Sequence, residues 1–272
     1  MQIKLLIRLA ISYVVLLMAI SCTPDSTASY QLPNDTDLHQ HQAGDRMVYQ
    51  VSGNKTDDNA VNQNLLGKIT QSWSASDLTS SPDNDDLTDV KLFTETIEFS
   101  DLASDTQQQY IRQNENGAWF LVAQINQNEQ VLWAKNDNDE FNTLLFAWPP
   151  NDQENPISAI NYQLVPCENS RCEPAIANVI KEVRYYGIET TKTPFAEFEA
   201  YKFSLHTSQT IATPDDFSSL QNIISAQFLW VYPPLGIIKY TMEQHINTGE
   251  SNQQIDYIAS LSQTNISLPE TQ

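Results

Sequence analysis

The chain has 272 residues, with 34 acidic and 14 basic side chains and a formal net charge of −20 at pH 7. Such a negative surface repels nucleic acid and anionic lipid, which argues against a nucleic-acid-binding protein and against membrane attachment through charge. The length suffices for one large domain or two small ones, each with a hydrophobic core.

The first 21 residues have the organisation of a signal peptide. Lys4 and Arg8 form a short basic region, and residues 9–21 (LAISYVVLLMAIS) carry no charge. This apolar run is shorter than the roughly 20 residues that a membrane-spanning helix needs. Residues 1–21 are therefore predicted to direct export and then to be removed.

A cysteine follows this run directly. Ala19, Ser21 and Cys22 resemble the lipobox of bacterial lipoproteins, in which small residues precede the cysteine that carries the lipid. An ordinary signal peptide with an incidental cysteine is the alternative. We expect acyl chains such as palmitate on Cys22, because each buried methylene contributes about 0.8 kcal/mol to membrane binding. Thr23 stands where an aspartate retains Gram-negative lipoproteins in the inner membrane, so the resemblance implies an outer-membrane anchor that faces the periplasm.

Residues 22–43 are polar, contain prolines and offer little to bury. We expect them to form a disordered tether between the lipid and the folded domain. His39 and His41 lie in this segment, and their spacing is compatible with loose metal binding. On a mobile tether, solvated histidines are the simpler expectation.

Residues 44–148 are predicted to form an N-terminal β lobe. Ile69, Gln71 and Trp73 alternate with polar neighbours, which is the period of two of a half-buried strand.

Turn signals divide this lobe into hairpins. Asn-Gly within residues 114–117 tolerates positive φ and predicts a hairpin turn, and a second turn is expected at residues 126–129. Two acidic segments, 54–64 and 76–89, lack an apolar stripe and are predicted to be exposed loops.

Residues 149–156 (PPNDQENP) interrupt any regular element and are predicted to be a linker. A C-terminal β lobe is expected over 157–262, followed by a tail at 263–272. Its one helix candidate is 215–225, which follows a proline, begins with acidic residues and has apolar residues at helical spacing. The predicted fold is mainly β, with antiparallel curved sheets, one short helix and, as an open alternative, two similar lobes.

Only two cysteines remain once Cys22 is lipidated. Cys167 and Cys172 have four residues between them and lie between strand-like runs, so a disulfide is predicted at a hairpin tip. A redox motif would have two intervening residues, and a zinc site would need further Cys or His nearby.

Three segments resemble a pattern in uncharacterised periplasmic and outer-membrane lipoproteins of Gram-negative bacteria. They are residues 44–49 (GDRMVY), 193–202 (TPFAEFEAYK) and 230–240 (WVYPPLGIIKY). They are similar to Gly-Asp-x-Trp-x-Tyr, Thr-Pro-x-Gly-x-Phe-x-Ala and Trp-Tyr-x-Pro-x-x-Gly-x-Val-Lys-Tyr, except that Met47 and Ala196 replace tryptophan and glycine. The resemblance implies a shared fold and brings no catalytic residue with it.

Motifs for catalysis and cofactors are not found in the sequence. The chain has no Gly-x-Ser-x-Gly elbow and no phosphate-binding loop. His206 follows an alternating aromatic strand and is expected at its rim, not as a catalytic base. The acidic run 83–89 departs from the calcium-loop template at several ligand positions. We therefore predict no catalytic residue, metal site or cofactor.

The aromatic residues are the one feature above background. The segments 118–122 and 228–232 are apolar on both alternating faces, as in strands that are covered on both sides. We predict that Trp119, Trp230 and Tyr232 line an apolar pocket if the sheet encloses one, with the candidate helix as a cover. A filled core is the alternative.

Three functions remain open from the sequence. The preferred one is a non-catalytic, lipid-anchored envelope lipoprotein that acts through contacts with an envelope protein. The second is a carrier or sensor of an apolar ligand in a curved-sheet pocket, and the third is a hydrolase.

Overall fold

The computed structural model describes residues 28–33, 37–58, 62–83, 86–100, 102–115, 117–148, 150, 158–168, 171–213, 216–249 and 251–268. The predicted signal peptide, Cys22, most of the predicted linker and the last four residues lie outside them. Within the described residues the strands are β1 (Ser29–Tyr30), β2 (Arg46–Asp57), β3 (Asn62–Ala75), β4 (Lys91–Phe99), β5 (Asp105–Gln113), β6 (Trp119–Ile125), β7 (Val131–Asn136), β8 (Thr143–Phe146), β9 (Ser158–Glu168), β10 (Arg171–Cys172), β11 (Ala177–Lys192), β12 (Glu197–Thr213), β13 (Asp216–Tyr232), β14 (Gly236–Asn247) and β15 (Asn252–Thr264).

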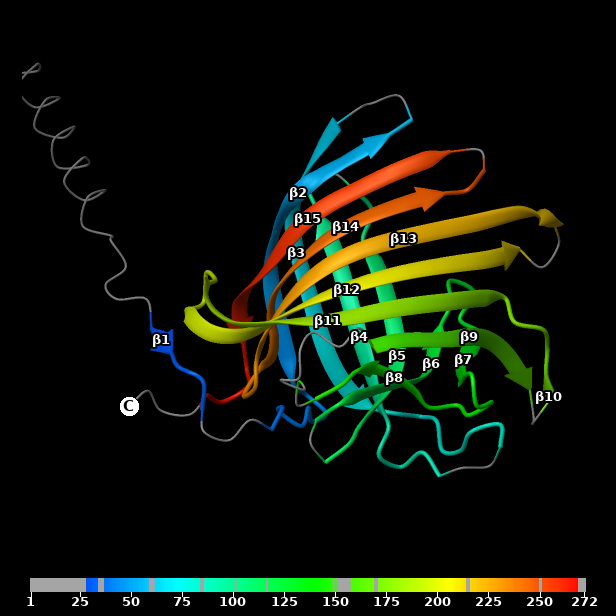
Figure 1. The fold of residues 1–272 in the computed structure, drawn as a ribbon, viewed down its shortest axis with the longest axis horizontal. Helices are drawn as coiled ribbons and strands as arrows, with labels where there is room; N and C mark the ends of the chain where they lie inside the picture. Colours follow the sequence, from blue (N-terminus) through cyan, green and yellow to red (C-terminus); the bar gives the residue numbers. More distant parts are fainter. Residues whose placement is uncertain are drawn as a thin grey trace, which may run out of the picture.

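Twelve antiparallel strands close into one barrel, in the order β12-β11-β9-β7-β6-β5-β4-β3-β2-β15-β14-β13, with β13 paired back to β12. Figure 1 shows the long strands β11–β15 crossing in front of β3–β5, so the barrel is flattened into two layers. The three additional strands extend it: β1 pairs with β12 in parallel, β8 with β6 and β10 with β9. Closure gives every strand of the ring a neighbour on both sides and so leaves no open sheet edge.

The two predicted lobes are wrong as separate sheets. Strand β15 pairs with β2, and β9 pairs with β7, so the two halves of the chain form two arcs of one ring and join at these two pairs. The prediction of curved antiparallel sheet is confirmed, but the strands close into a barrel instead of forming lobes.

The predicted helix at 215–225 is also wrong. Residues 216–225 belong to β13, whose residues Asn222–Val231 pair with β12 on one side and β14 on the other. Residues 221–225 alternate between more and less exposed positions, which is the period of a strand. Pairing with two neighbours outweighs the local helix signals. The described residues contain no helix, and hence none long and apolar enough to cross a membrane.

Both predicted hairpin turns are confirmed. Strands β5 and β6 pair across the first, where Gly117 has a φ of 90°. Strands β6 and β7 pair across the second, where the side chain of Asn126 accepts hydrogen bonds from the backbone N–H groups of Asn128 and Gln130. Asn136 makes the same contacts with Asn138 and Glu140, which gives a third turn that the sequence analysis missed.

The predicted disulfide is present. Cys167 and Cys172 face each other across the β9–β10 pair, with an S–S distance of 2.04 Å. It closes a short excursion between β9 and β11, which are themselves paired.

The prediction that segment 118–122 is covered on both sides is confirmed, although the cover is not a helix. Leu121 is fully buried in the main cluster inside the barrel. Its neighbour Val122 is fully buried in a second cluster with Leu87 and Val90. The acidic segment 76–89 is therefore not simply an exposed loop, because its Leu87 covers the outer face of the sheet.

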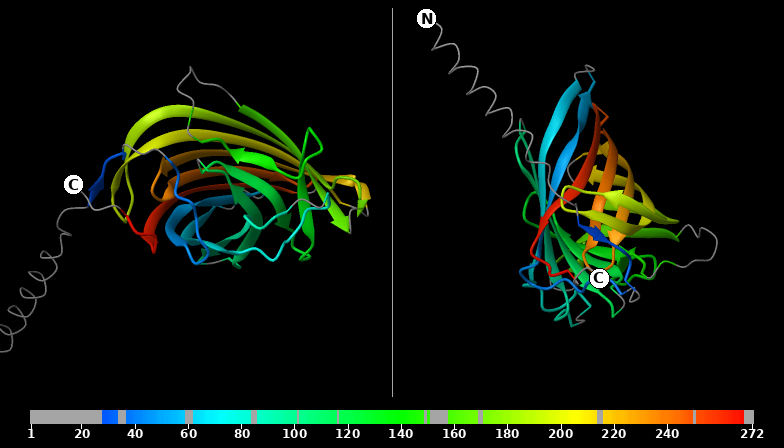
Figure 2. Two further views of the ribbon diagram at one scale, coloured as in Figure 1. Left: turned by 90° about the horizontal axis from the view of Figure 1, so that it is seen from below. Right: turned by 90° about the vertical axis from the view of Figure 1, so that its left-hand side faces the viewer.

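The predicted disordered tether is wrong for its described part. Residue Ser29 pairs with Glu197 in β12, and the ring of Tyr30 stacks on Phe198 with centroids 5.3 Å apart. Further along, Leu38 and His41 are 4% and 1% exposed. We call residues 28–33 and 37–45 the N-terminal segment. Its strand β1 lies at one end of the barrel, at the left of Figure 1 and toward the viewer in the right-hand view of Figure 2.

Candidate functional site: a cavity inside the barrel

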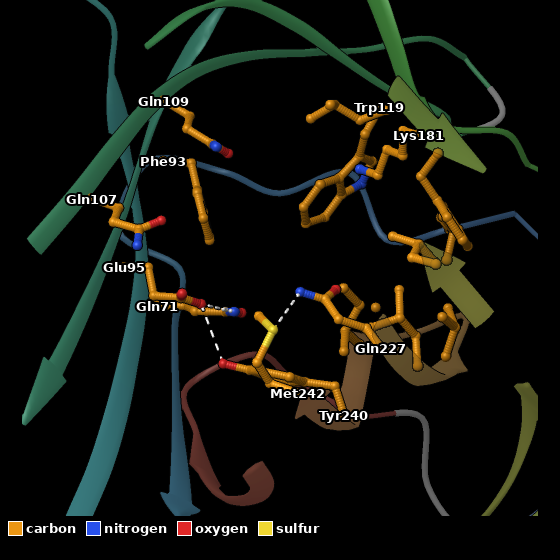
Figure 3. Close-up of a pocket in the computed structure, with 18 residues that line it drawn as sticks. Gln71, Phe93, Glu95, Gln107, Gln109, Trp119, Lys181, Gln227, Tyr240 and Met242 are labelled. Atoms are coloured by element: carbon orange, nitrogen blue, oxygen red, sulfur yellow. Dashed lines mark hydrogen bonds between the residues drawn. The ribbon is translucent and has the colours of Figure 1, made fainter. Parts of the chain in front are cut away.

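The barrel interior holds a cavity of about 220 Å³. Nine strands and the N-terminal segment contribute to its wall, so residues far apart in sequence meet there (Figure 3). It is lined by Leu38, Gln71, Phe93, Glu95, Gln107, Gln109, Trp119, Leu145, Phe146, Lys181, Leu205, Gln227, Leu229, Val231, Gly236, Ile237, Tyr240 and Met242.

One wall of the cavity carries a hydrogen-bonded polar network. The amide of Gln71 donates to a carboxylate oxygen of Glu95 at 2.7 Å, and the Tyr240 hydroxyl lies 3.5 Å from the same oxygen. Behind them, the Tyr49 hydroxyl donates to the carbonyl of Ile237 at 2.6 Å and lies 3.0 Å from the Gln71 carbonyl oxygen. Figure 3 shows Glu95, Gln71 and Tyr240 converging at one side of the cavity.

The electrostatics of this wall follow from burial. Loss of water raises the pKa of Glu95, and the hydrogen bonds from Gln71 and Tyr240 oppose that rise only in part. Burial, and then the charge of Glu95, raises the pKa of both Tyr49 and Tyr240 well above 10, so both hydroxyls stay protonated at neutral pH. On the opposite side, burial lowers the pKa of Lys181 to about 8.

Three further amides face the same space. Two of them are the side-chain amides of Gln107 and Gln109 on β5, and the third is that of Gln227 on β13. The amide of Gln227 contacts the sulfur of Met242 at 3.3 Å, which is a weak acceptor. The cavity therefore offers amide donors and acceptors that a polar ligand can use.

The remaining wall is apolar and partly aromatic. Phe93 and Trp119 lie with ring centroids 6.1 Å apart, and Figure 3 shows both rings at the cavity. Leu205, Leu229 and Val231 complete this wall. Apolar surface combined with a few placed polar groups is the usual composition of a small-molecule site.

Of the three predicted pocket residues, only Trp119 lines the cavity. Leu229 and Val231 face the cavity, so the alternation of β13 places Trp230 on the outer face of the sheet. There its indole N–H donates to Glu189, and the Nζ atom of Lys202 lies 5.0 Å from the centroid of its ring. Tyr232 packs on Phe198 beyond the cavity, with centroids 5.0 Å apart.

The polar residues of the cavity were not predicted from the sequence, although the alternation of residues in two strands indicates them. In β4, the period of two places Phe93, Glu95 and Ile97 on one face, so a carboxylate stands between two apolar residues. In β11, Lys181 stands between Val179 and Val183 in the same way. Charged residues on an apolar strand face indicate a polar group inside the fold.

His206 lies on β12, as predicted, and is exposed. The other histidine of the predicted domain, His245, pairs with Glu243 on the exposed surface of β14 at 3.2 Å. Neither is among the residues that line the cavity.

Comparison with protein-family models and with curated proteins gives no match. Among solved structures, the chain is similar to a protein from Bacteroides fragilis that is inferred to be exported and has a YmcC-like fold, with a TM-score of 0.40, 10% identity and coverage of 85% of this chain and 99% of that one. It is also similar to an inferred lipoprotein from Parabacteroides distasonis, with a TM-score of 0.36, 10% identity and coverage of 86% and 100%. At these values, neither likeness bears on the function of this chain.

Proposed function

We propose that this protein is a non-catalytic, lipid-anchored envelope lipoprotein whose barrel binds a small, uncharged polar ligand. The observation that carries the proposal is the cavity, in which Gln71, Glu95, Tyr240 and further amides face an aromatic wall. Lipidation of Cys22 and attachment to the outer membrane are proposed from the lipobox and from Thr23.

The size and lining of the cavity define the class of ligand. An apolar cavity of about 150 Å³ binds benzene, so about 220 Å³ suits a ligand moderately larger than one six-membered ring. A purely apolar ligand would exclude water from the amides of Gln107 and Gln109 without offering a hydrogen bond in return, which costs binding free energy. A single hydroxyl-rich or amide-bearing ring fits better than the apolar ligand expected from the sequence.

The proposal that the protein is not an enzyme rests on the groups placed at the cavity. Glu95 is the one carboxylate among the described lining residues, whereas glycoside hydrolysis uses two carboxylates on either side of the bond. The exposed His206 and the paired His245 lie elsewhere on the surface.

A thermal-shift experiment tests the ligand proposal. We expect glucose or N-acetylglucosamine at tens of millimolar to raise the melting temperature by at least 2 °C, because a ligand that binds only the folded state stabilises it. Gln227→Leu, which removes one cavity amide, should reduce this rise by at least half. Gln63→Leu, which removes an exposed amide on β3, should leave it unchanged. An equal rise in all three proteins, or no rise in the wild type, contradicts the proposal.

A second candidate function is contact with an envelope protein. Its support is a group of apolar side chains on the outer face, where Tyr186, Ile224 and Phe228 are 51%, 56% and 39% exposed. Tyr186 also packs edge-on against Phe228, with centroids 5.9 Å apart. Exposed apolar groups that gather in this way are typical of interaction sites.

A further inference from the structure

The N-terminal segment brings together three groups that can bind a metal ion. The Nε2 atom of His39 lies 2.8 Å from a carboxylate oxygen of Asp45, and the Nδ1 atom of His41 lies 3.5 Å from the same oxygen. One ligand atom from each of the three residues lies within 4.8 Å of the others. The predicted solvation is thus wrong for His41, which is 1% exposed, whereas the side chain of His39 is 26% exposed.

One atom of this cluster has no partner. The Nδ1 atom of His41 is buried and makes no hydrogen bond, although the carboxylate of Asp45 is nearby. A buried polar atom without a partner costs about 1–3 kcal/mol, so such atoms call for an explanation. A bound metal ion would satisfy this nitrogen.

The surroundings hold the His41 ring in position. It stacks on Trp73 with centroids 3.7 Å apart and an interplanar angle of 7°, and it lies edge-on to Trp119. Its backbone N–H donates to the side chain of Gln113 at 2.9 Å. Gly236 leaves room for the ring, because a Cβ there would lie 3.3 Å from its Nε2. The imidazole is thus fixed before any ion arrives.

His39 and Asp45 are held in a similar way but remain accessible. The backbone N–H of His39 donates to the carbonyl of Pro233, and Asp45 accepts from the backbone N–H of Gln42, both at 2.8 Å. Their side chains are 26% and 16% exposed, so an ion can reach the cluster from solvent.

We propose that His39, His41 and Asp45 form a site for a divalent transition-metal ion such as Zn²⁺. In a tetrahedral zinc site with bonds of about 2.0–2.1 Å, ligand atoms stand about 3.3 Å apart. The distances of 2.8 and 3.5 Å to Asp45 bracket this value, and the ligand atoms of the two histidines lie within 4.8 Å of each other, so rotation of the more exposed His39 side chain would complete the geometry. Two imidazoles and one carboxylate form a common zinc ligand set, and water would complete the coordination.

A role of Asp45 as a hydrogen-bond acceptor alone is the simpler alternative. It accounts for the contacts with His39 and with the backbone of Gln42. It leaves the Nδ1 atom of His41 unexplained. All three ligands belong to the N-terminal segment, so the metal would fix the conformation of this segment beside the cavity, which Leu38, Trp119 and Gly236 line.

Zinc titration of the mature lipoprotein in detergent, after treatment with EDTA, tests this site. We expect one Zn²⁺ per chain with a Kd tighter than 100 µM by calorimetry. His39→Gln and Asp45→Asn should weaken binding at least tenfold. The control His245→Gln removes an exposed histidine that also pairs with a carboxylate, and it should change the Kd by less than twofold.

A second readout does not depend on the variants. Co²⁺ in a site with two imidazoles and one carboxylate should give the strong visible absorption of a four-coordinate ion, and Zn²⁺ should abolish it. Far-UV circular dichroism in EDTA checks that each variant is folded. Absence of Zn²⁺ binding below 100 µM in the wild type, or wild-type affinity in both His39→Gln and Asp45→Asn, would overturn the proposal.

Discussion

At the scale of single residues, Glu95 has the clearest effect on the energetics. Its carboxyl group lies inside the barrel and accepts a hydrogen bond from Gln71. Burial raises its pKa above the usual 4.5, so the folded state holds the proton more tightly than the unfolded state. The wild type should therefore lose stability as pH rises from 4.5 through the raised pKa of the folded state.

We expect Glu95→Gln to remove this dependence. Below pH 4.5 the variant and the wild type should melt at similar temperatures, because the carboxyl is protonated in both folded and unfolded states. At neutral pH the variant should be more stable, by on the order of 1 kcal/mol, or about 2–4 °C. Melting curves between pH 4 and pH 8 measure the difference, and Glu98→Gln on the exposed side of β4 is the control. A difference that does not grow with pH would contradict the role of burial.

Single residues also show how far sequence reasoning reached. Trp119 was predicted at a pocket because its strand is apolar on both faces, which is a local property. Glu95 and His41 were not predicted as buried groups, because their burial depends on contacts far along the chain. His41, for example, stacks on Trp73.

At the scale of elements, local sequence patterns predict the strands and the hairpin turns well. They fail where pairing with a neighbouring strand decides the conformation of a segment. Asn-Gly and the short-range cysteine pair determine hairpins within a few residues, so both were found. The segment 215–225 has helix signals at its start. It forms a strand because β12 and β14 supply hydrogen bonds to both of its edges. The β15–β2 pair joins strands from opposite ends of the described chain and has no local signature in the sequence.

At the scale of the whole molecule, the N-terminal segment would set the distance between the membrane and the barrel in the lipid-anchored protein that we propose. Strand β1 begins at Ser29, seven residues after Cys22, instead of after a tether that reaches residue 43. Since an extended chain covers about 3.3–3.6 Å per residue, the lipid would hold the β1 end of the barrel within about 25 Å. The cavity and the proposed metal site share the N-terminal segment with this anchor.

This arrangement depends on lipidation of Cys22, which fractionation of cells tests. Cys22→Ala should move the protein from the membrane fraction to the soluble periplasmic fraction, because the acyl chains supply the binding free energy. Cys172→Ser, which breaks the disulfide but keeps the lipid, should stay in the membrane fraction. Undiminished membrane attachment of Cys22→Ala would show that another feature anchors the chain.

The central claim is that a small polar ligand binds inside the barrel, and Trp119 and Trp230 report on it most directly. Trp119 lines the cavity, whereas Trp230 lies on the outer face and donates to Glu189. In a protein with ¹⁵N-labelled tryptophan, whose five indole signals are assigned by Trp→Phe variants, N-acetylglucosamine and glucose are titrated separately. The account predicts that at least one of these sugars shifts the Trp119 signal in a saturable way and leaves the Trp230 signal in place. An unmoved Trp119 signal with both sugars, or a shift of Trp230 alone, would contradict it.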